Sequence, residues 1–311
     1  MTKQQLIIDT DCGVDDALAL LMALADPNVE ILGITCVSGN VALPKVLNNV
    51  GRVLDAVGAG PIPIFRGASR PLLMAPYHAD EVHGDDGLGD AGFPDTARRP
   101  ADEPAALAIV RLARAHPGAT LVPLGPLTNV ALALAIEPDL PRLLGGTVLM
   151  GGAFKGTGNS SAAAEFNIYA DPEAAALCFD RGLDPTCLDW EVTMATPLLW
   201  PVWDRLMAAG PIGGRFVGPM NLSLTERTRG RARPGILMPD PLAMAVVLDP
   251  ACATSIRAAV AVDTGHSAAR GMTTHDRTWH PAPPNATIVT SVDADRFAAL
   301  VERACALPCL L

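Results

Sequence analysis

Apolar residues in this 311-residue chain form short runs that alternate with longer segments of helical spacing. The apolar run 6–8 predicts the end of a buried strand. Segment 17–24 is rich in alanine and leucine, and Leu18, Leu21 and Met22 follow i, i+3, i+4 spacing within it. That pattern predicts a helix. The chain is therefore expected to begin with a strand followed by a helix.

The same alternation continues along the chain. Apolar runs that end at turns predict further strands at 30–37, 119–122, 147–150 and 185–188, and helical stretches at 103–115 and 172–179 lie between them. Alternating strands and helices imply right-handed crossovers and parallel pairing. The expected fold class is α/β, an open, mostly parallel sheet flanked by helices. No repeat or linker marks a second unit, so residues 1–311 are expected to form one domain.

Two stretches depart from this pattern and are predicted to be long loops. Segment 77–100 is rich in glycine and aspartate, and segment 222–241 is rich in arginine and proline. Loops of this length inside a compact domain are often lids or binding loops. Neither contains many aromatic residues that could stack on a planar ligand.

Composition narrows the classes of partner. The net charge of −10 argues against a nucleic-acid backbone or an anionic membrane. The longest apolar run, Ala17–Ala25, is too short to span a bilayer, and the polar start does not resemble a signal peptide. Seven scattered cysteines without a C-x-x-C pair indicate buried thiols in a reduced, cytoplasmic protein. Those expected to be buried are Cys12, Cys36, Cys178, Cys187 and Cys252.

Four aspartates stand within eight residues directly after the first predicted strand: Asp9, Asp11, Asp15 and Asp16. This strand-to-helix turn is where open α/β sheets bind ligands. Four like charges repel one another, and a hard divalent cation removes that cost. Helix capping would need only one or two acids, so the run predicts a metal site. A D-x-D turn also opens Mg²⁺ phosphohydrolases of the dehalogenase type, so the rest of the chain must decide.

Four later segments accompany the acidic run in order. They are 123–129 (PLGPLTN), 148–152 with Asn159 and 164–167 (AEFN), 171–175 (DPEAA), and 240–243 (DPLA). Together with the acidic run they resemble the inosine-uridine nucleoside hydrolases, which are calcium-dependent N-ribohydrolases. The resemblance runs from residue 6 to about 250. It implies a homo-oligomer, a dimer or a tetramer, that acts on small nucleosides in nucleoside salvage.

The resemblance also implies a Ca²⁺ ion held by Asp11, Asp16, Asp240 and the backbone carbonyl of Leu124. Calcium coordinates about six to eight oxygens, which leaves positions for water and two ribose hydroxyls. The calcium-bound water would attack the sugar through an oxocarbenium-like transition state, and Asp11 would take its proton.

The remaining roles follow from the same resemblance. Asp15 and Asp240 would hold the 2′- and 3′-hydroxyls, with Asn167 at the same diol edge. Asn159 and Glu165 would take the 5′-hydroxyl, Asn40 would steady the water, and Met150 would lie under the ring. The alternation of polar Glu165 and Asn167 with apolar neighbours is typical of a strand. Asp9 and Asp189 are expected to support the site rather than to bind the metal.

One position departs from the family pattern. Many members carry a histidine before the last calcium-binding aspartate, where it protonates the leaving base, and this chain has Pro239 there. His83 matches a histidine region of the family, and two interpretations stay open: it touches the base or sugar, or it is a surface histidine. Asp85 and Asp86 could donate a proton to the leaving base only if their pKa values were strongly raised. The preferred base stays open.

The second predicted loop contains Arg227, Arg229, Arg231 and Arg233. Such a run is typical of a solvated, mobile basic segment, and that interpretation is preferred. The alternative is a substrate with a negatively charged group. The sequence thus predicts a hydrolase that cleaves the N-glycosidic bond of ribonucleosides with a Ca²⁺-bound water. Two alternatives remain: a riboside-binding or weakly active homologue that takes an unusual riboside because of Pro239, and a Mg²⁺ phosphohydrolase.

Overall fold

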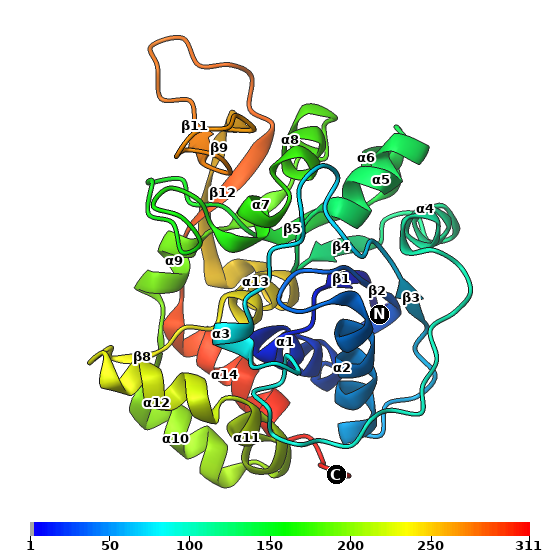
Figure 1. Ribbon diagram of the computed structural model, residues 1–311, viewed down its shortest axis with the longest axis vertical. Helices are drawn as coiled ribbons and strands as arrows, with labels where there is room; N and C mark the ends of the chain where they lie inside the picture. Colours follow the sequence, from blue (N-terminus) through cyan, green and yellow to red (C-terminus); the bar gives the residue numbers. More distant parts are fainter. Residues whose placement is uncertain (1–2) are drawn as a thin grey trace.

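The computed structural model describes residues 3–311, and its centre is one eight-stranded sheet (Figure 1). The strand order is β3-β2-β1-β4-β5-β6-β12-β9. Their bounds are β1 Gln4–Thr10, β2 Val29–Cys36, β3 Ile64–Arg66, β4 Thr120–Pro123, β5 Gly146–Met150, β6 Thr186–Leu188, β9 Ala253–Ala258 and β12 Ala286–Val292. Neighbouring strands pair in parallel except β9, which is antiparallel to β12. The predicted fold class is confirmed.

Helices cover both faces of this sheet because successive side chains of β1 point to opposite sides. Leu6 and Ile8 belong to one buried cluster, and Ile7 belongs to the other. The first cluster packs under α1 (Val14–Ala25), α2 (Leu43–Ala56), α13 (Pro239–Leu248) and α14 (Ala294–Cys305). The second packs under α4 (Ala105–Ala115), α5 (Thr128–Ile136), α6 (Leu140–Leu143) and α8 (Pro172–Asp180). Burial on both faces explains the near-continuous apolar runs in the sequence.

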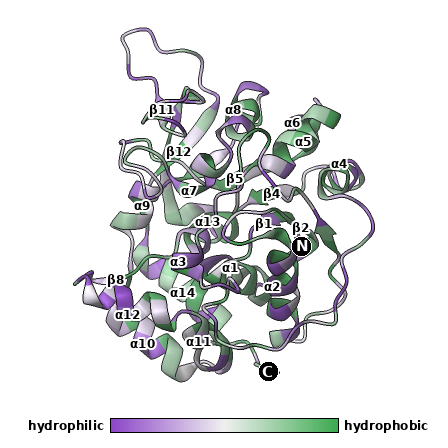
Figure 2. Ribbon diagram, viewed as in Figure 1, coloured by the Kyte–Doolittle hydropathy of each residue, from purple (hydrophilic) through white to green (hydrophobic). Residues whose placement is uncertain are grey.

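Smaller elements complete the molecule. The short helices are α3 (Asp80–His83), α7 (Phe166–Ala170), α9 (Trp190–Ala195), α10 (Trp200–Ala209), α11 (Gly218–Met220) and α12 (Leu222–Gly230), with η1 (Gly213–Val217) and η2 (Pro250–Cys252). Two antiparallel pairs join β7 (Leu198–Leu199) to β8 (Gly235–Ile236) and β10 (Val260–Val262) to β11 (Thr273–His275). In Figure 2, β1 and β2 are mainly apolar in colour, whereas α12 is largely polar.

Two local predictions were wrong and a third was incomplete. Segment 222–241 is not a loop, because α12, β8 and the start of α13 lie within it. Its arginines are good helix formers, and their charge obscured the helical spacing. Glu165 and Asn167 are not on a strand, because Glu165 is the N-cap of α7. Segment 77–100 is largely a loop, as predicted, but it contains α3.

Two expectations about the chain's environment can be compared with the fold. All seven cysteines are free, and the five expected to be buried are buried, as is Cys305. Among residues 3–311, no helix combines the length and the apolar character that crossing a bilayer would require.

Candidate active site

Two helix N-termini meet at the carboxyl end of β1 and bring three acids together. Asp15 and Asp16 lie in the first turn of α1, and Asp240 lies in the first turn of α13, which packs against α1 (Figure 1). A carboxylate oxygen from each lies within 4.8 Å of the others. The positive ends of both helix dipoles favour this negative charge.

Hydrogen bonds fix Asp16 in place. Its Oδ1 accepts from Thr10 Oγ1 at 2.5 Å, and its Oδ2 accepts from Gly13 N at 2.9 Å and Asn40 Nδ2 at 3.0 Å. Asn40, which follows β2, therefore joins two neighbouring strand ends.

Asp11 lies beside these acids in a tight backbone enclosure. Its Oδ2 accepts from Asn40 N at 2.7 Å. A Cβ atom on Gly39 would lie 2.0 Å from Asp11 Oδ2, and one on Gly125 would lie 2.7 Å from Asp11 Oδ1. Only glycine fits at both positions, so the loops after β2 and β4 are shaped around this carboxylate.

The electrostatics of the four acids fit a cation. Burial, together with repulsion among the acids, raises the pKa of Asp11 and Asp240 well above the ordinary value. Burial likewise raises the pKa of Asp16, and that of Asp15 to about 6. Among the described residues, Asp11 Oδ1 and Asp15 Oδ1 are buried without a hydrogen-bond partner. Unsatisfied, all-oxygen donors are what a hard divalent cation requires.

Above the acids lies a cavity of about 270 Å³. Nine of the predicted site residues line it: Asp15, Asn40, His83, Leu124, Met150, Asn159, Glu165, Asn167 and Asp240. Asp11 and Asp16 are fully buried beneath it. The structure thus brings together every residue that the sequence placed at the site.

Asn167 links two strand ends on one wall of this cavity. Its Nδ2 donates to the carbonyl oxygens of Leu124 at 2.6 Å and Met150 at 3.1 Å. The Met150 sulfur lies 3.3 Å from the same nitrogen. Because Leu124 follows β4 and Met150 ends β5, the Asn167 amide group fixes the spacing between the ends of these two strands.

Glu165 faces the cavity while it caps α7. Its carboxylate accepts from the backbone N–H groups of Asn167 at 2.9 Å, Ile168 at 3.2 Å and Gly152 at 3.1 Å. Burial raises the pKa of Glu165 to about 7 despite these bonds. The residue therefore holds the 151–152 turn against α7 as well as lining the cavity.

His83 is buried in the cavity wall rather than exposed at the surface. Its Nδ1 accepts from Val14 N at 3.2 Å and lies 3.8 Å from Asp15 Oδ1. Burial is the main cause that lowers the pKa of His83 to about 4, and the charge of Arg227 lowers it further. At neutral pH the ring is uncharged, and its proton is on Nε2 because Nδ1 accepts.

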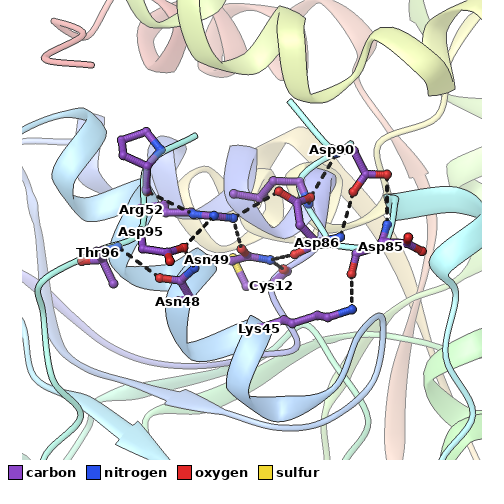
Figure 3. Close-up of polar contacts among 12 residues, drawn as sticks. Cys12, Lys45, Asn48, Asn49, Arg52, Asp85, Asp86, Asp90, Asp95 and Thr96 are labelled. Carbon is purple, nitrogen blue, oxygen red and sulfur yellow. Dashed lines mark hydrogen bonds and ion pairs between the residues drawn. The ribbon is translucent and has the colours of Figure 1, made fainter. Parts of the chain in front are cut away.

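A polar network ties the His83 loop to the acidic turn (Figure 3). Asn49 Nδ2 donates to the carbonyl oxygens of Cys12 at 3.2 Å and Asp86 at 2.8 Å. Arg52 pairs with Asp86 at 3.1 Å and Asp95 at 2.9 Å. Asp85 and Asp86 do not line the cavity, so the possibility that either protonates a substrate there finds no support in the geometry.

Asp9 and Asp189 hold neighbouring elements and do not line the cavity. Asp9 Oδ1 accepts from Thr35 Oγ1 at 2.5 Å and Asn129 Nδ2 at 2.8 Å. Asp189 caps α9 through Val192 N at 2.7 Å. These contacts fit the predicted supporting role.

Several lining residues were missed in the sequence. Tyr77, Phe166 and Trp190 line the cavity, and the Tyr77 and Phe166 rings lie 5.8 Å apart. Phe166 stands between two predicted site residues, and Trp190 follows Asp189. Their positions next to these residues in the sequence could have identified both aromatic side chains as part of the site.

The basic run was only partly as expected. Arg229, Arg231 and Arg233 are exposed, but Arg227 and Arg229 lie on a helix rather than a loop. Arg227, Arg231 and Arg233 line the cavity. Arg229 alone of the four faces away, toward Asp204 at 2.5 Å and the Trp200 ring.

Comparison with known proteins agrees with this arrangement. The family model described as inosine-uridine preferring nucleoside hydrolase matches residues 6–299. The chain belongs to this family. It is an enzyme that hydrolyses N-glycosidic bonds.

Three relatives illustrate the family's range. A pyrimidine-specific ribonucleoside hydrolase RihB of Escherichia coli O157:H7 is 34% identical over 305 residues, covering 97% of each chain. An inosine-uridine preferring nucleoside hydrolase of Leishmania major is 33% identical over 306 residues, covering 96% of each. The solved structure of a purine-preferring ribonucleoside hydrolase from Gardnerella vaginalis has a TM-score of 0.90 at 32% identity, covering 97% of this chain and 98% of that one.

Proposed function

We propose that this enzyme releases ribose and free base from ribonucleosides and that its resident metal is Ca²⁺. The observation that carries the proposal is the convergence of Asp15, Asp16 and Asp240 at one cavity, with Asp11 close enough to be affected by their charge. Asp11, Asp16, Asp240 and the Leu124 carbonyl would hold the ion. When bound, the ion would supply the positive charge that offsets these carboxylates and lowers the pKa of water in the site.

The protein's own residues then position the substrate. Asp15, Asp240 and Asn167 hold the 2′- and 3′-hydroxyls. Asn159 and Glu165 take the 5′-hydroxyl, and Met150 lies under the ring. All six line the same cavity, which supports one binding site for the sugar.

The chemical step needs a group that accepts the proton of water and a nucleobase that departs. Water attacks C1′, the C1′–N bond breaks with its electron pair going to the base, and Asp11 accepts the water's proton. The unpartnered Oδ1 of Asp11 supports this role, and Asn40 orients the water. His83 faces the substrate from the cavity wall. Pro239 lines the cavity where relatives place their acid, and it has no proton to give.

The Mg²⁺ phosphohydrolase alternative is disfavoured by the position of Asp9. That mechanism uses the first aspartate of D-x-D as the nucleophile. Asp9 Oδ1 is bound by Thr35 and Asn129, and the charges of Asp15 and Asp16 raise the pKa of Asp11 but do not act on Asp9, so Asp9 lies apart from the acid cluster. A homologue that is weakly active on ordinary nucleosides and acts on an unusual riboside is the second candidate, and the observation that favours it is Pro239.

The test is release of reducing sugar from a panel of purine and pyrimidine nucleosides, with and without a chelator. We expect turnover that a chelator abolishes and Ca²⁺ restores. Tight nucleoside binding with very little sugar release would favour the weakly active homologue instead. The names of the relatives differ in base preference, so the panel must include uridine, inosine and guanosine.

We further propose that residues 1–311 form a single domain, because one sheet contains both β1, near the start of the chain, and β12, near its end. From the family resemblance we also propose a homo-oligomer, a dimer or tetramer. Analytical ultracentrifugation would test the latter.

A further inference from the structure

One face of α12 lines the cavity. Leu224, Arg227, Thr228 and Arg231 follow i, i+3, i+4, i+7 spacing, and all four line the cavity. Arg233 extends this basic wall beyond the helix. Arg227 is half-buried, and Arg231 and Arg233 are exposed at the rim. Two arginines on one helical strip repel each other, so the arrangement has a cost that needs an opposing charge.

Glu81 also lines the cavity, but its carboxylate does not pair with these arginines. Among residues 3–311, no carboxylate forms an ion pair with Arg227, Arg231 or Arg233. The side chain of Arg227 donates only to the backbone carbonyl of Glu81. By contrast, Arg229 on the opposite face is neutralised by Asp204.

The basic wall lies on the side of the cavity where the base would be. Arg227 contacts α3 through Glu81, two residues from His83, and its charge acts on the His83 ring. Leu237 and Pro239 continue the same wall. The expected 5′-hydroxyl end is formed by Asn159 and by the carboxylate of Glu165, which would repel a 5′-phosphate. An anion on the base, rather than on the sugar, therefore matches the distribution of charge.

We propose that the α12 face selects ribonucleosides whose base carries an anionic group, such as a ring carboxylate. This inference rests on the proposed N-riboside hydrolysis and names its substrate class. Guanidinium groups bind carboxylates through paired, charge-assisted hydrogen bonds, which makes arginine the suitable residue here.

The absence of an acid at Pro239 is consistent with one kind of such substrate. In a pyridinium riboside the ring nitrogen is positively charged. When the C1′–N bond breaks, its electron pair neutralises that nitrogen, water supplies the new C1′–OH group, and the surplus proton leaves through Asp11. No proton has to reach the departing ring, so proline at position 239 is no obstacle.

The experiment compares two ribosides that differ by one charge. The pyridinium ribosides bearing a 3-carboxylate and a 3-carboxamide have nearly the same shape, and neither needs protonation to leave. With Ca²⁺ present, we expect kcat/KM for the carboxylate to exceed that for the carboxamide about tenfold or more. Arg227→Gln and Arg231→Gln should each lower this ratio severalfold, mainly through KM for the carboxylate. Arg229→Gln is the matched control and should leave the ratio unchanged.

Three results would count against the proposed preference for an anionic base or against the proposed hydrolysis. A wild-type ratio near one, or a ratio insensitive to Arg227 and Arg231, overturns the preference. Arginine-dependent preference for uridine 5′-monophosphate over uridine would place the anion on the sugar and also overturn it. If no riboside is hydrolysed, including p-nitrophenyl riboside with Ca²⁺, the proposed function fails instead. Calorimetric binding of the same pair to the wild type and to Arg231→Gln, whose side chain is exposed, still tests the inference.

Discussion

Asn167 Nδ2 lies 2.6 Å from the carbonyl oxygen of Leu124, so the amide proposed to hold ribose contacts the carbonyl proposed to bind calcium. A single side chain therefore couples the two ligands. We predict that Asn167→Ala weakens both nucleoside binding and calcium binding, by about 1–3 kcal/mol each, because the substrate loses a polar contact and the Leu124 carbonyl loses the group that holds it in position. Calcium-dependent activation curves and KM for uridine measure the two effects. Asn159→Ala serves as the control and should change KM alone, and an unchanged calcium affinity in Asn167→Ala would refute the coupling.

Removing the metal should destabilise the protein as well as stop turnover. Four buried carboxylates then repel one another without a counter-charge. We expect a chelator to lower Tm and Ca²⁺ at about 100 times its Kd to raise the unfolding free energy by about 2.7 kcal/mol. Asp16→Asn should lose this calcium response, whereas Asp180→Asn, which is exposed on α8, should keep it. Differential scanning calorimetry gives the readout.

The glycine at position 39 is a steric requirement of the site. Gly39→Ala would place Cβ 2.0 Å from Asp11 Oδ2, so the carboxylate or the loop must move. We predict at least a hundredfold loss of kcat with a smaller effect on folding, since displacing a catalytic group by about 1 Å costs about 10²-fold. Gly60→Ala, where nothing lies within 4 Å, is the matched control. Full activity in Gly39→Ala would mean that Asp11 does not need its present position.

Pro239 should make turnover depend on how readily the leaving group departs. A p-nitrophenyl riboside leaves without protonation, whereas uridine and inosine gain from an acid. We expect a larger ratio of activated to natural substrate turnover than in a relative with histidine there. Proline occupies N1 of α13, a position that does not need its N–H group, so histidine fits without loss of a helix hydrogen bond.

Pro239→His is therefore expected to speed natural nucleosides within the range of about 10²–10⁴ that general acids provide, while leaving the nitrophenyl substrate little changed. Steady-state kinetics on both substrates check this. If uridine is already cleaved as readily as the activated riboside, another group donates the proton, and His83→Ala is the next variant to measure.

Glu165 makes stability depend on pH. Burial raises its pKa in the folded state from 4.5 to about 7, so the folded protein holds this proton more tightly than the unfolded chain. The free energy of unfolding should therefore fall as pH rises from about 4.5 to about 7, by roughly 3 kcal/mol from this group. Glu165→Gln removes that slope, although it weakens the α7 cap at every pH. Urea titrations of the calcium-loaded proteins between pH 5 and 8 would measure the free energy of unfolding at each pH. If it changed with pH equally in the wild type and in Glu165→Gln, the raised pKa of Glu165 would be contradicted.

The sequence was sufficient to predict the site where several candidate ligands lie close together in one turn of the chain. The acidic run follows an apolar strand, and the turn geometry places its carboxylates at the sheet edge whatever the rest of the chain does. The parallel sheet was equally accessible because its strands are buried on both faces and appear as apolar runs.

Local patterns failed where distant packing decides the outcome. The polar sequence of α12 has little apolar periodicity, and the helix is supported by its contacts with α11 and β8. The alternation around Glu165 has the period of a strand, yet the carboxylate accepts hydrogen bonds from Asn167 N and Ile168 N and so begins a helix. Burial of His83 depends on Gly13, where a Cβ atom would lie 2.4 Å from the His83 ring. No local pattern contains that long-range fit.

The meeting of α1 and α13 has a consequence for how the chain matures. One contributes acids from near the start of the sequence and the other from its last quarter, so no nascent or truncated chain that lacks α13 can assemble the ion-binding cluster. The cation would then join the final stage of folding rather than guide its beginning. Its uptake would therefore report that α13 has been synthesised and has packed against α1.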